Sequence, residues 1–146
     1  MDVREYRPGD EKFIEIRPFD LIFNDHAGMA AVAQLSKWSY TALMETPVML
    51  FGASEQWKGV AHAWFAAGQA IRGHGLSVVK IVRATLDAVA EQNGLRRYNT
   101  LVHGKSLENI RFAKVVGFDY EFTMYGGAPD GSNLLGMVYW KKGDKP

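Results

Sequence analysis

The sequence predicts an α/β (α+β) fold in which helices cover both faces of a mixed, mostly antiparallel sheet. Short apolar segments separated by turn residues follow one another in the first half of the chain, which is typical of an antiparallel meander. Strand-like and helix-like segments alternate in the second half, which favours βα units. The length of 146 residues, with 47% hydrophobic and 23% charged residues, predicts a single globular domain over residues 1–146.

The first half of the chain carries four predicted strands and two predicted helices. Asp10 can cap a short helix to residue 16, which Pro18 would end. An Ala-rich stretch with apolar residues at helical spacing predicts a second helix over residues 27–38. Residues 19–23 are apolar but too few to favour a helix or a strand. Strands are expected at residues 3–7, 40–46, 48–53 and 60–67, with a turn at residues 56–59 before the last of them.

The second half of the chain contains the strongest helical pattern. A helix is predicted over residues 76–92, and Asn93-Gly94 ends it in a left-handed turn. Its buried stripe is expected to consist of Val78, Val79, Val82, Leu86, Val89 and Ala90. Ser106 can cap a further helix that runs to residue 116, where Gly117 closes it. The remaining strands are expected at residues 98–103, 119–125 and 134–140, with a loop at residues 126–131.

Composition excludes several classes of function. The chain has no cysteine, which excludes disulfides, thiolate metal sites and a cysteine nucleophile. A formal net charge of +1 favours neither a nucleic acid nor a membrane surface as the partner. The N-terminal residues are followed by no apolar stretch, so we expect no signal peptide and a cytoplasmic protein. Four scattered histidines without paired carboxylates predict no metal site.

A candidate phosphate site lies between the strand over Val60–Ala67 and the strong helix. A helix N-terminus leaves its first amide groups unpaired and carries partial positive charge. Gly73 and Gly75 allow the backbone to approach a bulky anion, and Arg72 adds a fixed charge with forked donors. Ser77 can donate one more hydrogen bond. The segment therefore predicts an anion site without the lysine of a P-loop, although glycines can also serve a plain strand-to-helix turn.

The pattern Arg72-x-x-Gly75-x-Ser77 resembles the diphosphate motif of the GNAT acyltransferases, in which the last position is Gly or Ala. The strand ending Phe65-Ala66-Ala67 and the helix ending Gly117-Phe118 are also similar to that family. The resemblance implies a GNAT fold and acetyl-CoA as the cosubstrate of transfer to an amine. The cofactor-binding residues it implies are Phe65, Ala67, Arg72, Gly73, His74, Gly75, Leu76 and Ser77.

Two departures from the family pattern concern catalysis. The tyrosine that commonly protonates the leaving thiolate in the family corresponds here to Ala113, and an asparagine near the start of that helix corresponds to Ser106. The candidate general bases are His103 and His62, because a histidine titrates near neutral pH. A structural role is open for both: His62 as a sheet residue packed beside an aromatic ring, and His103 as a strand-end residue bonded to a loop carbonyl.

A narrower resemblance links the chain to the small GNAT-like internal virion proteins of short-tailed phages. It rests on Pro47–Gly52, on Ala63-Trp64-Phe65 and on the helix segment Asn109–Lys114. Three functions therefore stay open: an N-acetyltransferase with an unknown amine acceptor, a catalytically degenerate virion or assembly scaffold, and a regulatory acyl-CoA-binding module. The resemblance to the GNAT family implies acyl-CoA as a partner and pairing into a homodimer. The narrower resemblance adds phage structural proteins as partners. If the protein is phage-encoded, it would reside in the host cytoplasm or in the virion.

Overall fold

The computed structural model describes residues 1–17, 19 and 25–146. Its strands are β1 (Asp2–Glu5), β2 (Trp38–Leu43), β3 (Pro47–Trp57), β4 (Val60–Ala67), β5 (Arg97–His103), β6 (Asp119–Met124) and β7 (Leu134–Trp140). Its helices are α1 (His26–Leu35), α2 (Gly75–Asn93) and α3 (Leu107–Val116), with 3-10 turns η1 (Asp10–Phe13) and η2 (Gln69–Ile71).

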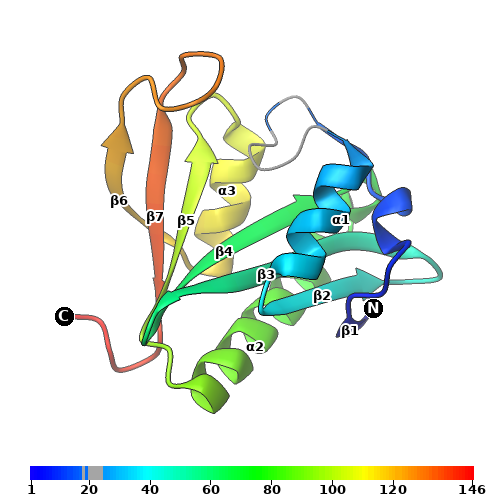
Figure 1. Ribbon diagram of the computed structural model, residues 1–146, viewed down its shortest axis with the longest axis horizontal. Helices are drawn as coiled ribbons and strands as arrows, with labels where there is room; N and C mark the ends of the chain where they lie inside the picture. The colour runs from blue at the N-terminus through cyan, green and yellow to red at the C-terminus, as the bar shows by residue number, and fades with distance from the viewer. Residues whose placement is uncertain (18, 20–24) are drawn as a thin grey trace.

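All seven strands form one sheet in the order β1-β2-β3-β4-β5-β7-β6. Every neighbouring pair is antiparallel except β4 and β5, which run parallel. Figure 1 shows α1 over one face of this sheet and α2 and α3 over the other. The predicted fold class, a mixed and mostly antiparallel sheet with helices on both faces, is therefore confirmed.

The alternation of side chains along β4 divides the core into two layers. Ala61 and Ala63 lie in the larger cluster, which contains the buried stripe of α2. Trp64 and Ala66 face the smaller cluster beneath α1. Neighbouring side chains of a strand point to opposite faces of the sheet, so the periodicity of β4 alone predicts this division.

The helices α2 and α3 match the predicted patterns closely. The six apolar residues of the α2 stripe are all buried, and Gly94 closes the helix with a φ of 67°. In α3 the Ser106 side chain accepts a hydrogen bond from the amide of Asn109, as expected for an N-cap. Both helices therefore begin and end within one or two residues of the predicted positions.

The first helices are shorter than predicted. Asp10 does not cap a helix that reaches residue 16. It is the first residue of the turn η1, which ends at Phe13, and its carboxylate is bonded to Arg4 and Thr41. The helix predicted over residues 27–38 ends at Leu35, because the backbone of Ser36 is extended and Trp38 begins β2. The predicted end of the first helix at Pro18, and residues 20–23, lie outside the described residues.

The hairpin of β3 and β4 is longer than predicted. β3 continues to Trp57, which pairs with Val60, so the turn consists of Lys58-Gly59 instead of residues 56–59. Gly59 has a φ of 87°, a left-handed conformation that favours glycine in such a turn. In the described part of the chain, no helix has the length and apolar character needed to cross a membrane.

Candidate functional site

The candidate site lies where β4 and β5 separate. The parallel ladder joins only Val60–His62 to Arg97–Asn99, and the strands diverge beyond it, as Figure 1 shows. The Thr100 hydroxyl donates to the Ala63 carbonyl at 2.9 Å, so this carbonyl faces β5. On the other side of β4, the Gly68 amide donates to Val48 of β3 at 3.1 Å.

These two hydrogen bonds determine which way the backbone of β4 points. The N–H and C=O groups of one strand residue point to the same side, and this direction alternates along the strand. Since Ala63 faces β5, Phe65 and Ala67 also turn their backbone groups toward β5, into the opening between the strands. The end of β4 therefore offers peptide donors and acceptors to anything that enters this opening.

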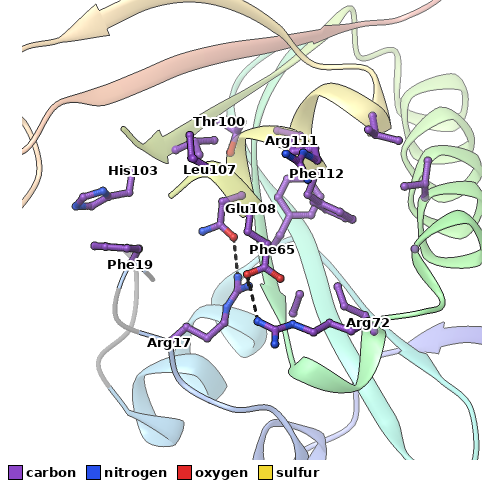
Figure 2. A pocket seen from close by; sticks show the side chains of 18 of the residues that line it. Arg17, Phe19, Phe65, Arg72, Thr100, His103, Leu107, Glu108, Arg111 and Phe112 are labelled. Atoms are coloured by element: carbon purple, nitrogen blue, oxygen red, sulfur yellow. Dashed lines mark hydrogen bonds and ion pairs between the residues drawn. The ribbon is translucent and has the colours of Figure 1, made fainter. Parts of the chain in front are cut away.

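A cavity of ≈ 1100 Å³ occupies the opening (Figure 2). It is bounded by the end of β4, the loop to α2 with the first turns of that helix, the end of β5 and α3 along most of its length. The lining includes all eight residues proposed to bind the cofactor, Phe65, Ala67, Arg72, Gly73, His74, Gly75, Leu76 and Ser77. The fold thus brings these residues, from the end of β4 and from the segment 72–77, together around one cavity.

The N-terminus of α2 forms one wall of the cavity. The first hydrogen bond of the helix runs from the Val78 amide to the His74 carbonyl, so the three preceding amides have no partner within the helix. A side chain at Gly75 would meet nothing within 4 Å, and Gly73 has a φ of 84°. Free amides, a positive helix end and open space at Gly75 fit a diphosphate.

Two arginines and one carboxylate lie at the edge of this wall. Arg72 Nη2 is 3.7 Å from Glu108 Oε2, and Arg17 Nη1 is 3.8 Å from the same oxygen. Arg17 Nη2 also donates to Asn109 Oδ1 at 2.8 Å. Sequence reasoning missed Arg17, since no local pattern connects it to α3, which lies about ninety positions further along the chain.

His103 lies at the end of β5, buried in the cavity wall. Its Nδ1 accepts from the Lys105 amide at 3.1 Å, and its Nε2 lies 3.0 Å from Asp130 Oδ2. The ring of Phe19 packs against the imidazole at 4.4 Å between centroids. Because Nδ1 is an acceptor, neutral His103 carries its proton on Nε2 and donates it to Asp130. His103 is thus bonded to a loop carboxylate and not to a loop carbonyl.

Asp130, on the loop before β7, is held as a carboxylate by this arrangement. A hydrogen bond from the Ser132 amide and a second from His103 lower its pKa from 3.8 to about 2. The loop is therefore attached to the cavity wall at neutral pH.

The structure places His62 apart from His103. His62 lies in the middle of β4, opposite Ser54 and Asn99 on the neighbouring strands, and shares the face of Trp64. Burial lowers its pKa, and it is not among the residues that line the cavity. Ala113 does line the cavity, where it supplies a buried methyl group and no proton donor.

Comparisons with solved structures identify the fold. Ard1 from Thermoplasma volcanium superposes with a TM-score of 0.77 at 16% identity, over 95% of this chain and 96% of that one. A GNAT-family acetyltransferase from Streptococcus pneumoniae superposes with a TM-score of 0.74 at 16% identity, over 94% of this chain and 97% of the other. The chain has the GNAT acetyltransferase fold.

A third similar structure is a ribosomal-protein-S5-alanine acetyltransferase from Vibrio fischeri. Its TM-score is 0.74 at 14% identity, over 99% of this chain and 94% of that chain. No protein-family model and no curated protein sequence matches the chain. At these identities the likeness shows the GNAT fold alone, and the activity has to be argued from the site.

Proposed function

We propose that this protein is an N-acetyltransferase that transfers an acetyl group from acetyl-CoA to an amine. The observation that supports the proposal best is the meeting of three features in one cavity: the unpaired amides of α2, the Arg72 guanidinium and the exposed backbone edge of β4. The diphosphate of acetyl-CoA needs an anion site, and the extended arm attached to it needs backbone groups to which it can hydrogen-bond. The cavity offers groups of both kinds.

Different residues along the cavity would bind different parts of acetyl-CoA. The amides of Gly75, Leu76 and Ser77 and the guanidinium of Arg72 would hold the diphosphate. The backbone groups of Phe65 and Ala67 would bond the extended arm as a further strand would. Bound in this way, acetyl-CoA supplies an activated acetyl thioester at the inner end of the opening.

The transfer itself requires little from the chain. An amide at the end of β4 can donate to the thioester carbonyl, which helps because that oxygen gains negative charge as the amine attacks. The cavity also holds the amine and the carbonyl carbon close together, which lowers the entropic cost of attack. A new C–N bond replaces the C–S bond, the amine loses a proton and the thiolate gains one. Since Ala113 cannot donate, the thiolate would take its proton from water.

Removal of the amine proton has two routes. His103 can accept it only after Nδ1 releases the Lys105 amide, because Nε2 already carries a proton. The other route is a chain of water molecules from the cavity mouth. His62 is a weaker candidate than His103 for the general base, since it lies outside the cavity lining.

A non-catalytic scaffold is the second candidate function. The apolar Ala113 wall and the fully engaged nitrogens of His103 favour it, since both remove a proton carrier from the cavity. The phage virion or assembly role rests on the sequence resemblance alone. Pairing of two copies is also a proposal, for which the exposed Tyr120, Phe122 and Met124 of the edge strand β6 are a candidate surface.

Calorimetric titration with CoA tests the proposal. We expect binding by the wild type, and Arg72→Ala should raise the Kd about 3- to 10-fold, between the worth of an exposed ion pair and of a charged hydrogen bond. Arg7→Ala is the matched control, since Arg7 is exposed and lies outside the cavity lining. Absence of binding at millimolar CoA would contradict the proposal. Acetylation assays over polyamines, amino acids and protein lysines then separate the enzyme from the scaffold.

A further inference from the structure

Two arginines from distant parts of the chain meet at a single carboxylate oxygen. Arg17 follows η1, and Arg72 follows η2, yet Arg17 Nη1 and Arg72 Nη2 lie 3.8 and 3.7 Å from Glu108 Oε2. Figure 2 shows both guanidinium groups directed at Glu108 in the cavity. The separation between Arg17 Nη1 and Arg72 Nη2 therefore cannot exceed the sum of these two distances, and the Glu108 carboxylate lies between them.

Glu108 is a weakly held anion in this position. Its side chain is 52% exposed, and both ion pairs are longer than a hydrogen bond. Ion pairs so open to solvent contribute little to stability, so an incoming anion can replace the carboxylate. Arg17 is held more firmly, because it is only 19% exposed and donates to Asn109 Oδ1 at 2.8 Å. The guanidinium is thus positioned before any ligand arrives.

We propose that Glu108 occupies the place of a phosphate and that the diphosphate of the bound acyl-CoA displaces it. Arg17 then becomes the second guanidinium of the diphosphate site, opposite Arg72. This inference rests on the proposed acyl-CoA site and adds a binding residue and an internal competitor to it.

The chemistry of the groups supports the exchange. A guanidinium fork matches two phosphate oxygens, and its hydrogen bonds to them are charge-assisted. The single carboxylate of Glu108 lies between the two arginines, whereas a diphosphate offers a negatively charged group to each guanidinium. The unpaired amides at the start of α2 add donors for the diphosphate that Glu108 does not use.

Calorimetric titration with CoA of two variants with opposite expected effects tests the inference. Arg17→Ala should weaken binding about 3- to 10-fold, between the worth of an exposed ion pair and of a charge-assisted hydrogen bond. Glu108→Gln should tighten binding about 2- to 5-fold, because it removes an exposed competing anion while keeping the shape of the side chain. Arg17→Lys, which keeps the charge but not the fork, should fall between the wild type and Arg17→Ala.

Two controls make the same charge changes elsewhere. Arg7→Ala removes an exposed arginine outside the cavity lining, and Glu91→Gln neutralises a glutamate whose partner is Lys141 at 3.1 Å. Neither should change the Kd for CoA. Thermal unfolding of every variant checks that the fold is retained.

The choice of ligand shows which phosphate is bound. Dephospho-CoA keeps the diphosphate and lacks the 3′-phosphate, so the effects of Arg17→Ala and Glu108→Gln should persist with it. Pantetheine, which has no diphosphate, should bind all variants alike.

The inference is overturned if folded Arg17→Ala binds CoA like the wild type, if Glu108→Gln fails to tighten binding, or if the Arg17 effect disappears with dephospho-CoA. In each of these cases the proposed function survives as long as Arg72→Ala still weakens binding. If neither the wild type nor Glu108→Gln binds CoA, both the inference and the proposed function fail.

Discussion

Replacing Gly75 by alanine should raise the stability of the protein and lower its affinity for CoA. Gly75 is the first residue of α2 and lines the cavity. Its φ is not among the positive values, and a Cβ there would meet nothing within 4 Å. Alanine therefore fits the unliganded protein, and the loss of unfolded-state entropy should raise the free energy of unfolding by about 0.4–1 kcal/mol.

The same methyl group would stand where a phosphate has to approach the amides of α2. Losing one charge-assisted hydrogen bond costs about 1.5–3 kcal/mol, which corresponds to a rise in Kd of about 10- to 150-fold. Thermal unfolding measures the first effect, and calorimetric titration with CoA measures the second. Gln92→Ala, near the other end of α2, is the control and should leave the Kd unchanged.

The opposite signs of the two effects make the experiment decisive. A Gly75→Ala protein that is folded, at least as stable as the wild type, and unchanged in its affinity for CoA would refute the diphosphate site at α2. A loss of both stability and affinity would instead show that the space at Gly75 is needed by the protein itself.

Two further predictions concern the buried polar residues Asp10 and His103. The burial of Asp10 raises its pKa, but hydrogen bonds from Arg4 and Thr41 outweigh this and leave it below 3.8, so its contribution to stability is present at neutral pH and is lost as the pH falls. Asp10→Asn should lower the Tm at pH 7 and flatten the fall of Tm between about pH 5 and pH 2, and an unchanged acid slope would contradict this reasoning. If His103 accepts the amine proton, His103→Ala should lower turnover while leaving the Kd for CoA close to that of the wild type. Full turnover of His103→Ala would assign the proton to water.

Features that depend on neighbours in the chain could be predicted from the sequence. The apolar stripe and glycine end of α2 and the Ser106 cap of α3 are confirmed, and the two faces of β4 follow from the period of a strand. Each arises from contacts within a few residues or from the repeat of one element, so the order of residue types is enough to reveal it. For the same reason the segment at residues 72–77 could be proposed as an anion site.

Features that join distant segments were decided by the tertiary structure. The carboxylate of Asp10 is bonded to Arg4 and Thr41, and α1 ends before the predicted position because β2 takes Trp38 into the sheet. Arg17 reaches Glu108 of α3, and Asp130 reaches His103, across long stretches of chain. Such contacts depend on how β4 and β5 diverge and on where α3 packs. The geometry of the whole sheet determines both, and no local sequence pattern reveals it.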